Sequence, residues 1–195
     1  MNRTIYFVRH GQTDWNAEFR FQGQQDIPIN ALGRQQAMRN GETLRAVLTD
    51  PEAFDFIASP LSRTRQTMEI IRGELDLPQN EYRTDRRLLE LNYGDWEGQT
   101  IDEMRQSHGE MSEARNRNKW EFVPPGNGAE SYAMLSQRFE PWLSETLKQS
   151  VCVTHGGVLR CIWRLVGGKS ADEAGQLIIP QDRILRMENT SLEWI

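Results

Sequence analysis

The sequence contains few cysteines and no long apolar run. Cys152 and Cys161 are the two cysteines of the 195-residue chain, and both lie among apolar or helix-forming residues. We expect reduced thiols in the core rather than a disulfide or a redox pair. Because no run of about 18 apolar residues is present, a membrane partner is not expected. The apolar stretch after Arg3 is too short for a secretory signal, which favours a cytoplasmic location.

An excess of basic residues is also lacking. The chain has 23 Lys and Arg residues against 28 Asp and Glu residues, so its formal net charge is −5. Proteins that bind nucleic acids normally carry a basic excess that neutralises phosphates, so no nucleic-acid partner is expected. Any anion site in this chain must therefore be a local cluster of basic groups.

The chain lacks internal repeats, and its length favours a single domain over residues 1–195. Short apolar runs predict strands at 4–8, 54–58, 82–84, 151–154, 184–187 and 192–194, the last two as edge strands. Helical periodicity predicts helices at 32–48, 61–71, 132–147 and 158–166, and Pro141 is expected to kink or restart the third. This alternation predicts an α/β sandwich around a largely parallel sheet, with a ligand site beyond the carboxyl ends of the strands.

Two His-Gly pairs lie at the ends of predicted strands. Arg9 and His10 directly follow the first apolar run, and His155 and Gly156 follow the run SVCVT. Burying an unpaired charge is costly, so a buried strand that ends in a guanidinium and an imidazole needs a partner, of which an anion is the simplest. The glycines allow a tight turn and a close approach by a ligand. The third histidine, His108, has no such context and is expected to be solvated.

The passages SPLSRTRQT and RRLLELNYGDWEG contain two further candidates. Arg63 would lie in the first turn of a helix that starts near Pro60, where its charge opposes the helix dipole unless an anion is bound. Arg65 faces elsewhere on that helix and is expected to form a surface ion pair. Glu90 follows an apolar pair and is expected to be partly buried, as suits a general acid, with a solvated loop glutamate as the alternative.

Five motifs follow one another along the chain: RHGQTDWN, GQQDIPINALGRQQA, SPLSRTRQT, LLELNYGDWEG and VTHGGVLR. Their order and spacing, from Thr4 to about Val166, resemble the histidine phosphatase superfamily, the phosphoglycerate mutase-like group. The resemblance implies a three-layer α/β/α fold and a metal-independent phosphomonoesterase without a cofactor. Its substrate would be a small phosphorylated metabolite.

The resemblance also implies a role for each site residue. His10 would be the nucleophile that becomes phosphohistidine, and Glu90 the general acid and base. Because His10 must attack as a neutral imidazole while Glu90 must begin protonated, we expect a bell-shaped pH profile. The phosphoryl group would be held by Arg9, Arg63 and His155, with further phosphate contacts from Asn16, Gln22, Gly23 and Gly156.

Residues 99–128 are expected to form a cap over the site. The segment is short and of mixed charge, unlike the larger basic insertion of cofactor-dependent mutases, so a phosphatase is favoured over a mutase-type phosphotransferase. A catalytically idle phospho-ligand-binding module is the alternative from a different class of protein. An exposed edge strand would also permit a homodimer.

Several side chains near the cap admit both a functional and a structural interpretation. Arg105, Arg115, Arg117 and Lys119 are candidates to select an acidic substrate, and a solvated helix face is the alternative. Trp15, Trp96 and Trp120 are candidates to line the pocket, with ordinary packing favoured. The passage PPGNGAES departs from the Pro-Gly-Gly-Glu-Ser form expected there, which weakens a substrate role for Glu130 and Ser131.

Overall fold

Six short runs of residues form one sheet in the computed structural model, which describes residues 3–195. The sheet order is β3-β2-β4-β1-β5-β6. The pairs β1–β4, β2–β4 and β2–β3 are parallel, and β5 is antiparallel to both of its neighbours. The predicted, mostly parallel sheet is confirmed. Its strands are β1 (Thr4–Arg9), β2 (Asp55–Ala58), β3 (Arg83–Thr84), β4 (Ser150–Thr154), β5 (Ile184–Glu188) and β6 (Ser191–Trp194).

One of the two predicted edge strands is not at an edge. Strand β5 pairs with β1 on one side and with β6 on the other, so only β6 and β3 have a free edge. The physical reason is the tight hairpin between β5 and β6, where Asn189 takes up a positive φ of 56° and returns the chain alongside β5. Strand β6 therefore covers the edge that β5 would otherwise expose.

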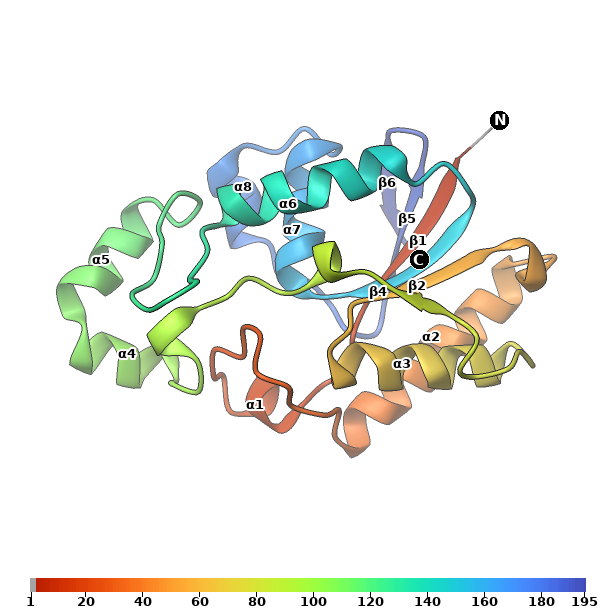
Figure 1. Ribbon diagram of the computed structural model, residues 1–195, viewed down its shortest axis with the longest axis horizontal. Coiled ribbons are helices and arrows are strands. Elements are labelled where there is room, and N and C mark those ends of the chain that lie inside the picture. The colour runs from red at the N-terminus through yellow and green to blue at the C-terminus, as the bar shows by residue number, and fades with distance from the viewer. Residues whose placement is uncertain (1–2) are drawn as a thin grey trace.

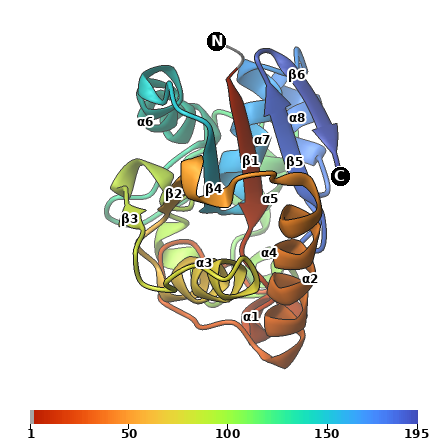
Figure 2. The ribbon, with the colours of Figure 1, turned by 90° about the vertical axis from the view of Figure 1, so that its right-hand side faces the viewer.

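Helices cover both faces of the sheet and make three layers (Figures 1 and 2). Helices α2 (Ala31–Val47) and α3 (Ser62–Glu74) lie on one face, and α6 (Tyr132–Glu145) and α7 (Gly156–Leu165) lie on the other. The side chains of β1 alternate between the two cores, as the period of a strand requires. Ile5 and Phe7 pack in the core under α6 and α7, and Tyr6 and Val8 pack in the core under α2 and α3. The predicted three-layer fold is confirmed.

The remaining elements are short. They are α1 (Asp14–Ala17), α4 (Ile101–Ser107), α5 (Gly109–Arg117) and α8 (Ala171–Gln176), with 3-10 turns at Pro51–Ala53, Arg86–Leu88 and Gly94–Trp96. Within residues 3–195, no helix has the length and apolar character needed to cross a membrane. Cys152 and Cys161 are buried and unpaired, as expected.

Helix α6 continues through Pro141 and does not restart there. A proline inside a helix removes one backbone hydrogen bond, so packing must offset the loss. The buried face next to Pro141 provides that packing: Trp142 is 1% exposed, and its ring lies 5.6 Å from that of Phe139 and 6.2 Å from that of Phe7.

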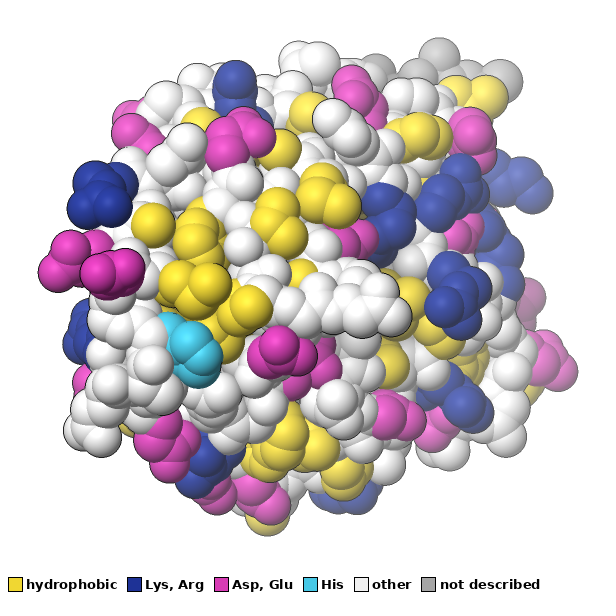
Figure 3. Space-filling model, turned by 60° about the vertical axis from the view of Figure 1, so that its left-hand side comes forward, with side chains coloured by type: hydrophobic (Ala, Val, Ile, Leu, Met, Phe, Trp, Pro, Cys, Tyr) yellow, Lys and Arg dark blue, Asp and Glu magenta, His cyan; other side chains and the backbone are white. Residues whose placement is uncertain are grey.

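Helices α4 and α5 belong to the segment 99–128 and lie at one end of the molecule (Figure 1). Their outer surface mixes acidic and basic side chains, as expected (Figure 3). The tryptophans near this segment pack rather than line a pocket: Trp96 stacks on Phe122 with ring centres 5.2 Å apart, and Trp120 stacks on Tyr132 at 5.3 Å. A small core of Phe21, Trp96 and Met104 joins the segment to the body of the protein.

The start of α2 packs directly on the loop that follows His10. A Cβ atom on Gly33 would lie 2.2 Å from the carbonyl oxygen of Gln12, and one on Gly11 would lie 2.2 Å from the carbonyl oxygen of Gly33. This contact leaves no room for a side chain on either residue. The loop is thus held by helix packing as well as by its strand.

We therefore expect Gly33→Ala to lower the free energy of unfolding by about 1–3 kcal/mol, because the new methyl group must displace backbone. The matched control is Gly109→Ala on α5, where nothing lies within 4 Å of the new Cβ atom. Chemical denaturation of the two variants measures the difference. Equal stability of Gly33→Ala and the wild type would contradict the close contact.

Candidate active site

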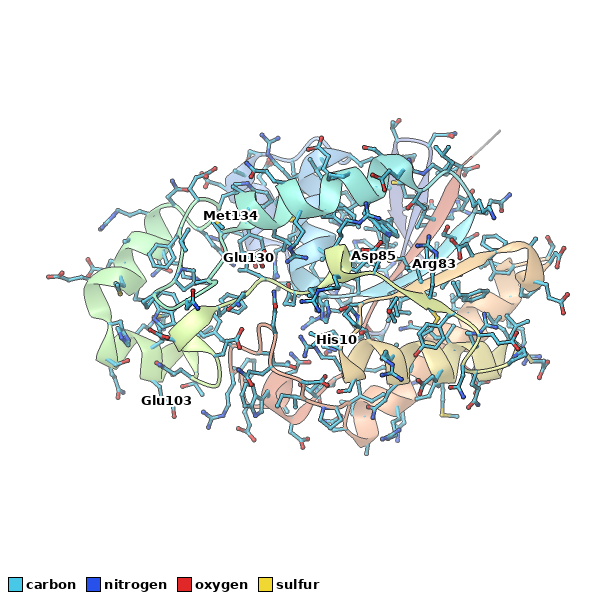
Figure 4. All side chains as sticks on the ribbon, in the orientation of Figure 1. His10, Arg83, Asp85, Glu103, Glu130 and Met134 are labelled. Atoms are coloured by element: carbon cyan, nitrogen blue, oxygen red, sulfur yellow. The ribbon has the colours of Figure 1, made fainter. Side chains whose placement is uncertain are left out.

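The parallel strands bring the chain's candidate residues to one edge of the sheet. Arg9 pairs with Thr154 in register, so His10 and His155 both follow directly at the carboxyl ends of β1 and β4. The backbone N–H of His10 donates to the carbonyl oxygen of Thr154 at 3.0 Å, and the two imidazole centres are 5.2 Å apart. Figure 4 shows His10 between Glu103 on α4 and Arg83 on β3.

A cavity of about 150 Å³ opens at this edge. Every predicted site residue except His155 lines it, although their chemical roles remain predictions. Four further lining residues were not identified from the sequence, because they lie in elements whose relative positions depend on the whole fold. The predicted residues are Arg9, His10, Asn16, Gln22, Gly23, Arg63, Glu90 and Gly156, and the additional ones are Arg20, Phe21, Tyr93 and Arg160.

The His10 imidazole is buried and held in one tautomer. Its Nδ1 lies 2.8 Å from the carbonyl oxygen of Gly11. A carbonyl oxygen can only accept, so Nδ1 carries the proton and Nε2 keeps a free lone pair. Burial, together with the charges of Arg63 and Arg9, lowers the pKa of His10 well below 6.5. His10 is therefore a neutral base with an available nitrogen at neutral pH.

His155 lies behind the cavity wall, and both of its ring nitrogens are hydrogen-bonded. Nε of Arg63 donates to Nδ1 of His155 at 3.3 Å, and Nε2 lies 2.8 Å from Oγ of Ser59. Because Nδ1 accepts, the proton is on Nε2. Burial and the charge of Arg63 also lower the pKa of His155 well below 6.5. This histidine fixes Arg63 in place, while its predicted contact with a phosphoryl group stays a prediction.

Two guanidinium groups are buried beside the imidazoles. Arg63 is fully buried and donates to the carbonyl oxygens of Gln25 at 2.6 Å and Gly23 at 2.7 Å. Arg9 donates to the carbonyl oxygen of Ile179 at 2.6 Å, and its buried Nε has no partner within the described residues. Burial lowers the pKa of each arginine to about 10, so both stay charged at neutral pH.

Neither of these arginines forms an ion pair with any carboxylate of residues 3–195. Glu90 lines the same cavity and acts on both charges, but it forms no direct pair with either arginine. Buried guanidiniums without a direct ion pair therefore favour an anion in the cavity. Fixed guanidinium forks favour an anion with several oxygens, such as a phosphoryl group.

Glu90 is partly buried, as predicted, and both of its oxygens are held by backbone. Oε1 accepts from the N–H of Leu91 at 2.9 Å, and Oε2 accepts from the N–H of Gly157 at 3.1 Å. A Cβ atom on Gly157 would lie 2.1 Å from Oε1, so only glycine leaves room for the carboxyl group at the start of α7. Each oxygen has a second lone pair for a proton.

Asn16 and Gln22 bring amide groups to the cavity. Oδ1 of Asn16 accepts from the N–H of Thr13 at 3.2 Å and from Nε2 of Gln181 at 3.1 Å, so the amide NH₂ faces away from these bonds. The same Nε2 of Gln181 donates to the carbonyl oxygen of His10 at 3.0 Å. Gln181 is thus a positioning residue that was not identified from the sequence.

Gly23 needs its positive φ of 51°, and a Cβ atom there would lie 1.8 Å from Oε1 of Glu97. Its carbonyl oxygen accepts a hydrogen bond from Arg63, so this turn helps to hold the Arg63 guanidinium in place. The buried Oε1 of Gln22 has no hydrogen-bond partner within the described residues.

Other candidates have structural positions. Glu130 pairs with Arg138 at 2.9 Å, and Ser131 caps α6 by accepting from the N–H of Met134. Arg65 is exposed and donates to the hydroxyl of Tyr82, which in turn donates to the carboxylate of Glu69 on the same helix. The predicted surface ion pair of Arg65 is therefore wrong, because Tyr82 lies between the two charges. His108, which was expected to be solvated and outside the site, is half-buried near the Trp96 ring and lines neither this cavity nor its neighbour.

The hydrogen bonds predict opposite tautomers for the two buried histidines. Long-range ¹H–¹⁵N NMR spectra should show the proton of His10 on Nδ1 and that of His155 on Nε2. Because burial and the arginines lower both pKa values, both rings should stay neutral as the pH falls through about 6.5, the ordinary histidine pKa. His10→Gln and His155→Gln assign the signals. Protonation of either ring near pH 6.5 would contradict this electrostatic description.

Comparisons with known proteins agree with this geometry. The family model of the histidine phosphatase superfamily (branch 1) matches residues 5–194. A protein named probable phosphoglycerate mutase GpmB, from Salmonella paratyphi C, is 33% identical over 197 residues, which cover 98% of this chain and 87% of the relative.

Two solved structures have the same fold along nearly their whole length. Bacillus stearothermophilus YhfR is 31% identical with a TM-score of 0.78, covering 98% of this chain and 94% of its own. A mycobacterial glucosyl-3-phosphoglycerate phosphatase in complex with VO3 is 25% identical with a TM-score of 0.79, covering 99% and 96%. With its motifs, its cavity and these matches, the chain belongs to the histidine phosphatase superfamily, in branch 1.

Proposed function

We propose that the protein is a phosphomonoesterase that works through a phosphohistidine at His10. The observation that carries the proposal is the neutral, buried imidazole of His10, whose Nε2 is free beside the unpaired guanidiniums of Arg9 and Arg63. Phosphoryl transfer needs mainly positioning and stabilisation of charge on the equatorial oxygens. The two arginines supply that charge.

The proposed reaction has two steps. In the first, Nε2 of His10 attacks phosphorus, the bond to the ester oxygen breaks, and Glu90 gives its proton to the leaving alcohol. In the second, water attacks phosphorus, the bond to Nε2 breaks, and Glu90 takes a proton from the water. Free phosphate leaves, and both side chains return to their starting states.

A mutase-type phosphotransferase is the second candidate, because one relative is named a probable phosphoglycerate mutase. The two activities differ in whether water or a second alcohol takes the phosphoryl group. The short cap of mixed charge, in which Arg105 and Arg117 pair with Asp102 and Glu113, favours the phosphatase. Release of free phosphate from a phosphomonoester, compared with transfer to an added acceptor alcohol, separates them.

Hydrolysis of an aryl phosphate in excess EDTA tests the roles of the side chains. We expect the wild type to turn over, His10→Ala to show no turnover, and Glu90→Gln to be slower by about 10²- to 10⁴-fold. The matched control is His108→Ala, which removes a histidine that lines neither cavity and should keep wild-type activity. Activity in His10→Ala, or dependence on an added metal, would refute the proposed mechanism.

The pH profile of kcat/KM tests the protonation states. Only neutral His10 can attack, and burial with the neighbouring arginines lowers its pKa, so the acid limb should lie well below pH 6.5. A general acid must be protonated to act, so the activity should also fall towards high pH. A profile that is flat from about pH 4 to pH 9, or an acid limb near pH 6.5, would count against these assignments.

A further inference from the structure

A larger chamber, of about 650 Å³, adjoins the catalytic cavity on the side of the cap. The two spaces are adjacent, because they share lining residues from four parts of the chain. A phosphomonoester with its phosphoryl group beside His10 would place its alcohol portion in this chamber. The shared residues are Arg9, Asn16, Arg20, Phe21, Tyr93 and Arg160.

The chamber is strongly basic in a protein whose net charge is −5. None of its described lining residues is Asp or Glu, whereas five are cationic. Arg20 is neutralised by Glu18 and Glu103. The cations that remain on the cap side are Arg115 on α5, Lys119 just after it, and Arg160 on α7.

Neutral groups are the partners of these three cations. Nζ of Lys119 donates to the carbonyl oxygen of Gly175 at 2.6 Å and lies 5.9 Å from the centre of the Tyr132 ring. Arg160 donates to the carbonyl oxygen of Leu177 at 3.0 Å and to the hydroxyl of Tyr132 at 3.3 Å. The Arg115 guanidinium lies 5.3 Å from the centre of the Phe21 ring. None of the three forms an ion pair within residues 3–195.

The other two basic residues considered on the cap behave differently. Arg105 pairs with Asp102 and Arg117 pairs with Glu113, and both arginines are exposed. The cap therefore separates its basic residues into a neutralised outer pair and an inner set that faces the chamber. Glu90, which lines the adjoining cavity, acts on Arg160, but the charges of Arg160 and Arg115 both lower the pKa of Lys119. A bound anion would offset this repulsion between like charges.

We propose that Arg115, Lys119 and Arg160 form a second anion site, which binds a carboxylate or phosphate on the alcohol portion of the substrate. This inference rests on the proposed function and narrows its substrate class to phosphomonoesters that carry a second oxyanion. The aromatic side chains of Phe21 and Tyr132 also line the chamber.

The strength of this site depends on pH through Lys119. Burial, followed by the charges of Arg160 and Arg115, lowers the pKa of Lys119 to about 7. The groups that face it are Arg115 from α5, Arg160 from α7, the Tyr132 ring from α6 and the Gly175 carbonyl from α8. Lys119 is thus charged below pH 7 and neutral above it, so binding of the second anion should weaken as the pH rises through 7.

Calorimetric binding of phosphonates, which the enzyme cannot hydrolyse, tests the site without relying on turnover. The probes are alkylphosphonates of several chain lengths that end in a hydroxyl, a carboxylate or a second phosphonate. One pH unit below the Lys119 pKa, we expect an anionic end to tighten binding by about tenfold to a hundredfold over the hydroxyl end. The preferred end, carboxylate or phosphonate, identifies the oxyanion.

Substitutions separate binding from a structural role of Lys119. Lys119→Met should lower the affinity for the anionic probes about tenfold while changing the hydroxyl probe much less, and Lys119→Arg should restore the preference and remove its decline above pH 7. Arg117→Met, on the outer face of the cap, is the matched control and should behave as the wild type. If Lys119 only fastens the cap to Gly175, its loss will weaken all probes equally.

The two proposals fail in different ways. Equal binding of hydroxyl and anionic probes by the wild type would overturn the second anion site and leave the phosphatase proposal untouched. Selective binding of anionic probes by a protein that hydrolyses no phosphomonoester would support the site and overturn the phosphatase.

Discussion

The site depends on burying positive charge that forms no direct ion pair with a carboxylate of the described chain. Arg63 is fully buried, and three hydrogen-bond acceptors around it, two carbonyl oxygens and Nδ1 of His155, hold it in one orientation. Burial, together with the charge of Arg63, lowers the pKa of both imidazoles and keeps them neutral, which leaves Nε2 of His10 unprotonated. The loop after His10 has no freedom to relax, because Gly11 and Gly33 bring it into contact with α2. The free energy needed to hold this arrangement is recovered when an anion enters.

Much of this arrangement could be predicted from the sequence because it depends on local patterns. Apolar runs that end in charged residues predict strand ends, and parallel strands place their carboxyl ends at one edge. Arg9, His10 and His155 meet for that reason. The position of Arg63 near this edge could be predicted in the same way, because its helix starts soon after a strand and Arg63 lies in the first turn.

The remaining features depend on contacts between distant segments. The four cap residues Arg105, Arg115, Arg117 and Lys119 look alike in the sequence, and only the docking of the cap decides which of them face the chamber. The tautomers of the two histidines depend on hydrogen bonds to Gly11 and Arg63, which periodicity cannot identify as partners. The position of β5 inside the sheet depends on which strand of the last hairpin pairs with β1, and that strand is β5 rather than β6. Sequence patterns give each element's type, whereas packing decides its neighbours.

The central claim is that His10 carries the phosphoryl group during turnover, and rapid quenching with a labelled phosphomonoester tests it most directly. The account predicts up to one phosphoryl group per chain on Nε2 of His10, labile to acid and stable to base as a phosphohistidine is. Turnover without any labelled protein, or label on another residue, would contradict the account.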